Sequence, residues 1–212
     1  MDHREAVTGR PLNAAQEARS RSAILRNAFV GALAVGGAIG TGALLGRAGR
    51  ADAAVGPKDA KILNFLLELE QLQTTFFDRI GRDARFGAEV RQFSSVTAKQ
   101  DRAHATALRA MLGSAAKPTT ADLKADPHTD AEFIRDALEL KEAAVAAYLG
   151  EGPNLRLDKI QDVASIVSVE ARHAAWIRSI DAVIPAPRAA DRSQAPHDVV
   201  RTLERAGIAT VR

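Results

Sequence analysis

The chain contains no cysteine among its 212 residues. This absence excludes disulfide bonds, thiolate zinc sites and cysteine nucleophiles. Any bound metal ion must therefore be held by carboxylate and imidazole groups. Aromatic residues make up only 4% of the chain, whereas alanine is abundant, so the composition favours α-helices.

Most of the chain also has no net positive charge. The isoelectric point of about 9.5 by itself suggests binding to a polyanion. However, the basic excess lies in residues 1–53, which hold seven arginines and four acidic residues, while the other 159 residues hold 22 basic and 22 acidic residues. The body of the chain thus has no net basic charge to attract nucleic acid, and we expect no nucleic-acid partner.

Residues 1–53 are predicted to be an export signal peptide with a long n-region. Residues 28–45, AFVGALAVGGAIGTGALL, form an uncharged run with five glycines, and Ala51-Asp52-Ala53 suits signal peptidase cleavage before Ala54. We expect an exported protein, periplasmic or extracellular in a bacterial cell envelope, with no stable membrane span after cleavage. A retained anchor is the alternative, since the run is only marginally long enough to span a bilayer.

The sequence is compatible with either the twin-arginine route or the general secretion route. The stretch RSRSAILR at residues 19–26 resembles a degenerate twin-arginine motif, but its arginines are not consecutive. Twin-arginine export would allow a cofactor to be loaded before the protein leaves the cytoplasm.

Hydrophobic periodicity predicts four long helices, over residues 58–80, 88–112, 129–149 and 155–183. The connector at 114–128 contains two prolines and is long enough to run the length of a bundle. We therefore predict an all-α fold, in which residues 54–183 form an antiparallel four-helix bundle with a long crossover between its second and third helices. Residues 184–212 are predicted to be a tail with a short helix near 197–207.

The stretch Ser168–Trp176 places an acid and a histidine on a face expected to be buried. Glu170 and His173 are three residues apart, so they lie on the same side of a helix. Asp101 and His104 repeat this spacing in the second helix. A bound metal ion is one reason to bury an acid beside an imidazole, because an unpaired buried charge is costly.

The first and third helices add further polar groups to the buried face. Glu70 lies on the apolar stripe of the first helix, and Lys141 lies on that of the third. Tyr148 is interpreted as a core residue, with a hydrogen bond to a site carboxylate as the alternative. The set is nearly the di-metal carboxylate pattern, in which two helices give a Glu each and two others give Glu-x-x-His. The predicted metal ligands are Glu70, Asp101, His104, Glu170 and His173.

These segments resemble the ferritin-like superfamily, especially bacterial exported proteins with a ferritin-like domain. The resemblance covers roughly residues 58–183. It implies a four-helix bundle with a central iron or manganese site, and activities that include iron oxidation and storage, peroxide scavenging and oxygen activation. The segments that carry it are ILNFLLELEQLQTTFF, DRAHATAL, FIRDALELKEAAVAAY and IVSVEARHAAW.

Two residues depart from the family pattern. Asp101 stands where the family has Glu, and Lys141 stands where the third helix usually has its Glu. A protonated lysine cannot bind a metal ion. Glu142 could replace it only through a local shift in helix register, because a one-residue step turns a side chain by about 100°. Lys141 offsets one of the three carboxylates Glu70, Asp101 and Glu170, and the negative charge that remains suits one divalent ion. It also suits a centre without metal, in which Lys141 forms salt bridges.

We therefore expect an exported ferritin-like protein with a degraded metal site that is either non-catalytic or binds metal weakly. A stress-related role is one of the functions that we consider. The alternative is a di-iron or di-manganese oxidoreductase that oxidises metal or scavenges peroxide in the cell envelope. Iron, manganese and no cofactor at all stay open, and a homodimer is one of the alternatives for the oligomeric state.

Overall fold

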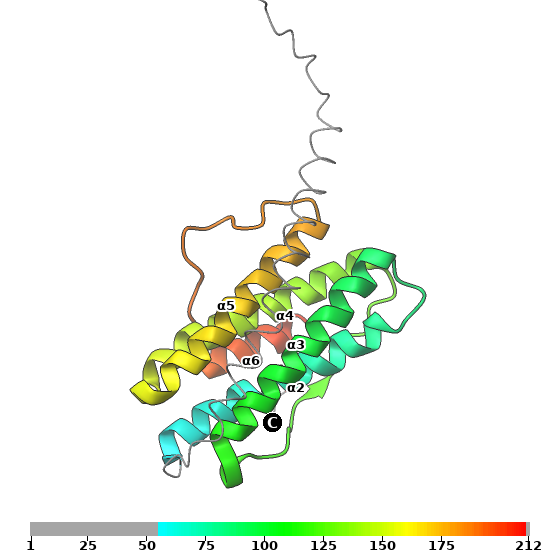
Figure 1. Cartoon of the computed structure of the whole chain (residues 1–212). Helices are drawn as coiled ribbons and strands as arrows, with labels where there is room; N and C mark the ends of the chain where they lie inside the picture. Colours follow the sequence, from blue (N-terminus) through cyan, green and yellow to red (C-terminus); the bar gives the residue numbers. More distant parts are fainter. Residues whose placement is uncertain (1–54, 211–212) are drawn as a thin grey trace, which may run out of the picture.

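A computed structural model describes residues 55–210, which fold into an all-α bundle (Figure 1). The predicted signal peptide and its cleavage site lie outside these residues. The all-α fold class with a short C-terminal helix is confirmed. The helices are α2 (Pro57–Gly81), α3 (Ala88–Leu112), α4 (Asp130–Glu151), α5 (Leu157–Ile180) and α6 (Pro196–Arg205).

Helices α2 and α3 form the first antiparallel hairpin. Pro57 suits the first turn of α2, where a backbone N–H would have no partner within the helix. Gly81 ends α2 close to α3, because a Cβ atom on this glycine would lie 2.7 Å from Oγ of Ser95. The second predicted helix matches α3 residue for residue.

The connection from α3 to α4 runs along α2 as a crossover. Asn64 donates a hydrogen bond to the carbonyl oxygen of Ala115, Glu68 accepts one from the backbone of Thr120, and Arg79 donates one to the carbonyl oxygen of Ala125. The crossover therefore returns the chain to the end of the bundle where α3 began. Helix α4 starts there, and Thr129 forms a capping box with Glu132 at its N-terminus.

Helix α5 ends three residues earlier than predicted. The prolines at 185 and 187 do not end it. Instead, Ala182 adopts a positive φ of 57°. The N–H of Val183 donates a hydrogen bond to the carbonyl oxygen of Arg178, and the N–H of Ala182 donates one to the carbonyl oxygen of Ser179. These bonds form a Schellman motif, which satisfies the last carbonyls of the helix.

The C-terminal part of the chain folds back onto the bundle. Helix α6 packs against α4, and its Val199 and Leu203 are fully buried. The chain then pairs β2 (Ala209–Thr210) with β1 (Asp122–Leu123) of the crossover in an antiparallel ladder. This ladder could not be predicted from the sequence, because two strands of two residues each carry no alternating hydrophobic pattern.

An aromatic cluster fills the core next to the α2–α3 turn. The rings of Phe76 and Phe133 stack with centroids 5.6 Å apart, and Phe77 meets both Phe93 and Phe133 edge to face. All four rings are fully buried. This cluster joins α2, α3 and α4 and closes one end of the bundle interior.

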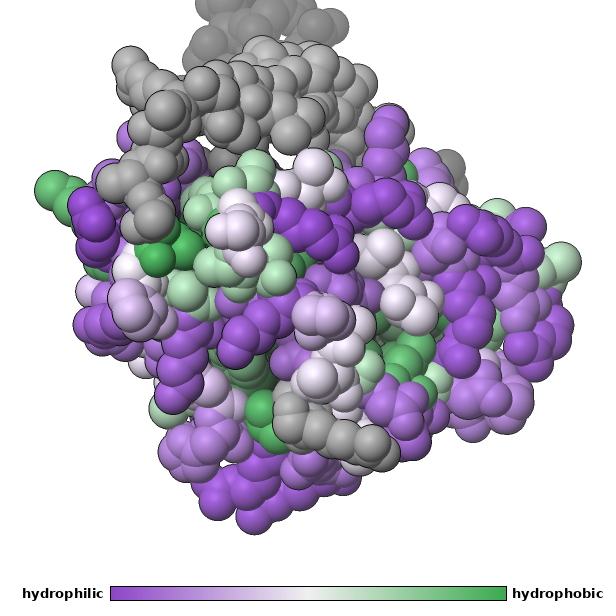
Figure 2. Space-filling view, turned by 90° about the horizontal axis from the view of Figure 1, so that it is seen from below, coloured by the Kyte–Doolittle hydropathy of each residue, from purple (hydrophilic) through white to green (hydrophobic). Residues whose placement is uncertain are grey.

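The outer surface of the bundle is mainly hydrophilic on the face seen in Figure 2, where apolar residues form only small patches. Within residues 55–210, none of the helices combines the length and the apolar character that a membrane crossing requires.

Candidate metal centre

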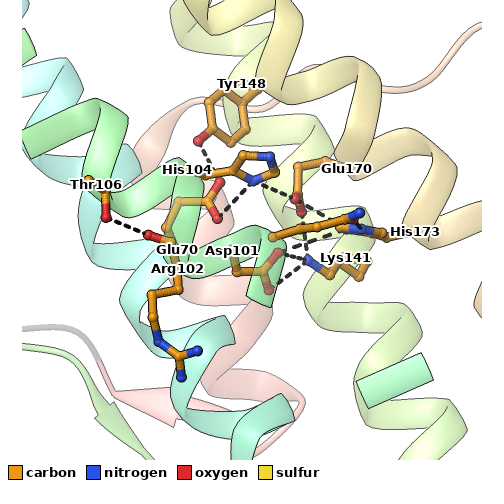
Figure 3. A network of polar contacts seen from close by, with 10 residues as sticks. Glu70, Asp101, Arg102, His104, Thr106, Lys141, Tyr148, Glu170 and His173 are labelled. Carbon is orange, nitrogen blue, oxygen red and sulfur yellow. Dashed lines mark hydrogen bonds and ion pairs between the residues drawn. The ribbon is translucent and has the colours of Figure 1, made fainter. Parts of the chain in front are cut away.

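Polar side chains from all four long helices meet in the middle of the bundle (Figure 3). Helix α2 supplies Glu70, α3 supplies Asp101 and His104, α4 supplies Lys141, and α5 supplies Glu170 and His173. None of the six is more than 3% exposed. The structure therefore brings together all five predicted metal ligands.

Lys141, and not Glu142, faces this centre. Its ammonium Nζ lies 2.8 Å and 3.0 Å from the two oxygens of Asp101 and 2.9 Å from Oε2 of Glu170. Glu142 points to the other side of α4, where it pairs with Arg178 and Arg188. The helix keeps its regular register, so the alternative of a register shift is wrong.

Three of the site residues, Glu70, Glu170 and His173, have one polar atom held by a neighbour. Oε2 of Glu170 accepts the hydrogen bond from Lys141. Tyr148 donates a hydrogen bond of 2.6 Å to Oε1 of Glu70. Nε2 of His173 lies 2.5 Å from Oε1 of Gln100. Because the amide oxygen of Gln100 can only accept, Nε2 of His173 carries the proton and Nδ1 is left with a free lone pair.

The other polar atom of each of these residues faces the centre and has no hydrogen-bond partner within the described part of the chain. The same is true of Nδ1 of His104. Nδ1 of His104 lies 3.4 Å from Oε2 of Glu70 and 3.3 Å from Oε1 of Glu170, and Nδ1 of His173 lies 3.3 Å from that same oxygen. Four unpartnered atoms thus converge: Glu70 Oε2, His104 Nδ1, Glu170 Oε1 and His173 Nδ1.

A purely spatial grouping gives a slightly different set. One ligand atom each from Glu70, Asp101, His104 and Glu170 can be chosen so that all four lie within 4.8 Å of one another. In this set Asp101 replaces His173. We favour His173 as the ligand, because both oxygens of Asp101 already accept hydrogen bonds from Lys141.

Burial and charge together set the protonation of the centre in the metal-free protein. Burial, together with the nearby charge of Lys141, lowers the pKa of His173 to about 4, so this imidazole is neutral. Burial disfavours the charge on His104 as well, but Glu70 and Glu170 outweigh it and raise its pKa to about 10. Asp101 and Glu170 likewise outweigh the effect of burial on Lys141 and raise its pKa, so the ammonium stays charged.

Two contacts of the centre were less visible in the sequence. Tyr148 is a core residue, as interpreted, and it also forms the hydrogen bond to Glu70 that was the alternative. Gln100 is not among the predicted site residues. Its position four residues before His104 is a weak signal, because its partner His173 lies on another helix.

Comparison with known proteins agrees with this geometry. A family model described as a ferritin-like domain matches residues 58–182, more than half of the chain. The chain belongs to the ferritin-like domain family. A search of curated proteins finds no match to it.

Most carboxylate oxygens of this ferritin-like centre already accept hydrogen bonds. Members of the family with an intact two-metal pattern have four carboxylates to hold both ions. Here the ammonium of Lys141 lies between Asp101 and Glu170, where it uses three of the six carboxylate oxygens, and Tyr148 uses a fourth. The two oxygens that are left and Nδ1 of His173 are free to bind an ion, and Nδ1 of His104 can join them once it gives up the proton that Glu70 and Glu170 stabilise.

Proposed function

We propose that this ferritin-like protein binds one divalent metal ion through Glu70, His104, Glu170 and His173, and that Lys141 takes the place of the second ion. The observation that carries the proposal is the convergence of four buried ligand atoms that form no hydrogen bond of normal geometry within residues 55–210 and are linked to one another only by ion-pair contacts of 3.3–3.4 Å. Buried polar atoms normally have a partner. Two carboxylates and two imidazoles are suitable ligands for iron, manganese or zinc.

The spacing of these atoms supports a shared ion. Ligand atoms that each lie about 2.0–2.2 Å from one ion are roughly 3 Å from their neighbours. The three measured separations among them are 3.3 Å, 3.3 Å and 3.4 Å. A bound ion would thus need only small side-chain movements.

Charge balance also favours one ion. Glu70, Asp101 and Glu170 bring three negative charges to the centre, and Lys141 brings one positive charge. One divalent ion with neutral imidazoles makes this buried group electrically neutral, whereas two divalent ions leave it with an excess of two positive charges. An uncompensated charge in a protein interior is costly, so the second ion is disfavoured.

The burial of the centre argues for metal binding without turnover of an organic substrate. Each of the four ligands is at most 3% exposed. A bound ion would supply Lewis acidity and, for iron or manganese, a change of one electron. The protein's own residues hold the ion, neutralise it and exclude bulk water.

We further propose that the protein does this work in the cell envelope after export. The proposal is supported by the n-region, the uncharged run at residues 28–45 and the cleavage pattern before Ala54. N-terminal sequencing of the mature protein from a fractionated bacterial cell tests it. A chain that begins at Ala54 outside the cytoplasm supports export, and an intact N-terminus in the cytoplasm contradicts it.

Metal analysis of the protein purified without chelator tests the main proposal. We expect one divalent ion per chain, and we expect His173→Gln to lose it. His197→Gln is the matched control, because His197 is exposed on α6. Two equivalents of iron or manganese per chain, or no metal after reconstitution, would contradict the proposal. Metal retained in His173→Gln would shift the site to the set that contains Asp101.

A further inference from the structure

Each carboxylate among the proposed metal ligands has only one oxygen free (Figure 3). Oε1 of Glu70 accepts the hydrogen bond of 2.6 Å from Tyr148, and Oε2 of Glu170 accepts the one of 2.9 Å from Lys141. A hydrogen bond to one oxygen orients a carboxylate so that it binds an ion through the other oxygen. Glu70 and Glu170 therefore offer one ligand atom each.

Each imidazole likewise offers one nitrogen. Nε2 of His173 is held by Gln100, so Nδ1 is left for the ion. Nδ1 of His104 faces the two glutamates, and metal binding displaces its proton. The proposed ligands thus supply four atoms, two nitrogens and two oxygens. Because none of these ligands is more than 3% exposed, bulk solvent is kept away from the ion.

The charge of the centre suits an ion that stays divalent. Glu70, Asp101 and Glu170 carry three negative charges. Lys141 carries one positive charge, so one divalent ion makes the buried group neutral. Oxidation of the ion to the trivalent state would leave one positive charge uncompensated in the protein interior, which is costly. Redox chemistry at iron or manganese needs this change, whereas zinc has no redox chemistry.

The separations between the ligand atoms agree with four ligands. Zinc bonds of about 2.0–2.1 Å in a tetrahedron place neighbouring ligand atoms about 3.3–3.4 Å apart. Six ligands around an octahedral ion such as manganese, at about 2.1–2.2 Å, lie about 3.0–3.1 Å apart. The three measured separations are 3.4 Å between Glu70 and His104, 3.3 Å between His104 and Glu170, and 3.3 Å between Glu170 and His173. They match the tetrahedral value.

We propose that this one-ion centre is a closed, four-coordinate zinc site, in which the ion cross-links α2, α3 and α5 and takes no part in redox chemistry. Zinc is one of the ions that the proposed function allows, and its assignment rests on that function. Structural zinc sites take all four ligands from the protein, whereas catalytic ones keep a position for water or substrate. Tyr148 and Lys141 act as positioning residues, because each holds one carboxylate oxygen away from the ion.

Cobalt(II) bound in place of zinc tests the number of ligands. Affinity alone does not identify the ion, because most nitrogen and oxygen sites bind zinc more tightly than iron or manganese. The visible absorption of cobalt(II) is strong with four ligands and weak with six. We expect strong absorption that saturates at one cobalt per chain and is lost when one equivalent of zinc is added.

The same titration separates the zinc site from the proposed function. Weak absorption at one cobalt per chain would overturn the zinc site and leave the binding of a single ion intact. Binding of no cobalt, or of two ions per chain, would overturn both.

Tyr148→Phe tests the positioning of Glu70. Without the hydroxyl, Oε1 of Glu70 is free and the carboxylate can bind the ion through both oxygens. We expect one cobalt per chain still to bind, with an absorption per cobalt clearly below that of the wild type. A tyrosine that only packs in the core would leave the spectrum unchanged, which would contradict its positioning role. Ser94→Ala is the matched control, because it removes another fully buried hydroxyl, one that has no hydrogen-bond partner within residues 55–210.

Iron tests the absence of redox chemistry. The protein is loaded with one ferrous ion per chain without oxygen, exposed to air and separated from unbound iron by gel filtration. We expect no ferric signal in the electron paramagnetic resonance spectrum of the protein fraction, because a trivalent ion leaves an uncompensated positive charge. A ferric ion that stays bound to the protein would overturn the assignment of a redox-inactive centre.

Discussion

Nζ of Lys141 lies 2.8 Å and 3.0 Å from the two oxygens of Asp101, at a depth where neither side chain is exposed to solvent. The pair joins α3 to α4 across the middle of the bundle. In the proposed one-ion centre, the ammonium of Lys141 supplies the positive charge that a second metal ion would otherwise bring.

We first predict that Lys141→Met destabilises the metal-free protein strongly. Methionine fills a similar volume but leaves Asp101 and Glu170 without their partner. Removing one member of a buried ion pair costs about 3–5 kcal/mol. The free energy of unfolding in denaturant, measured with chelator present, checks this value.

Lys99→Met is the control for this variant, since Lys99 is an exposed lysine on α3. We expect its free energy of unfolding to stay close to that of the wild type. Equal losses in both variants would show that the buried ammonium does not stabilise the bundle.

We next predict that Lys141→Glu raises the metal content from one ion per chain to two. This change removes the cation and adds a fourth carboxylate at the third-helix position. The centre then holds four negative charges, which balance two divalent ions. Metal analysis after reconstitution and gel filtration measures the stoichiometry. A content that stays at one ion would mean that the shorter Asp101 side chain also prevents the second site.

Much of the fold could be predicted from the sequence, because the long helices have a strong hydrophobic period. The same period placed Glu70 on the buried stripe of α2 and Lys141 on that of α4, and both are fully buried. A local pattern of this kind is set by each helix alone, so it can be found without knowledge of the partners.

Contacts between distant segments could not be predicted in this way. The hydrogen bond from His173 to Gln100 joins residues 73 positions apart, and the ladder of β1 with β2 joins the crossover to the end of the chain. The early end of α5 depends on a positive φ at Ala182, a conformation that alanine rarely adopts. None of these features leaves a periodic signal in the sequence.

The contact between Gln100 and His173 leads to a third prediction. Gln100→Leu removes the acceptor that keeps the proton on Nε2, so Nδ1 is no longer held free for a metal ion. Losing such a supporting group typically lowers metal affinity by about 10–100-fold. Competition with a chromophoric chelator measures the affinity. Gln100→Glu keeps an acceptor at the same place and should retain most of the affinity, whereas a purely packing role would not distinguish the two variants.

A fourth prediction concerns the pH dependence of stability at the start of α4. The carboxylate of Glu132 accepts hydrogen bonds from the backbone N–H groups of His128 and Thr129, and these bonds lower its pKa below the ordinary value of 4.5. Because the folded pKa is the lower one, this contribution is fully present above pH 4.5 and is lost as the pH falls through the folded value.

Glu132→Gln should therefore be less stable than the wild type at neutral pH, with a difference that shrinks in acid. Denaturant unfolding at a series of pH values between neutral and strongly acidic measures it. Glu139→Gln is the control, because Glu139 lies in the middle of the same helix, away from the cap. A difference that does not vary with pH would contradict a role for the ionised carboxylate.

The last prediction concerns the close approach of the segment 181–195 to α4. A Cβ atom on Gly150 would lie 2.0 Å from the carbonyl oxygen of Gln194, which is backbone and cannot rotate away. The N–H of Gln194 also bonds to the carbonyl of Ala146 at 3.0 Å. Gly150→Ala should thus displace this segment and cost about 1–3 kcal/mol. Faster proteolysis between residues 181 and 195, together with a lower free energy of unfolding, would show the displacement. Gly56→Ala, where an added Cβ meets nothing within 4 Å, should change neither measurement, and the same result for Gly150→Ala would mean that the segment does not pack against α4.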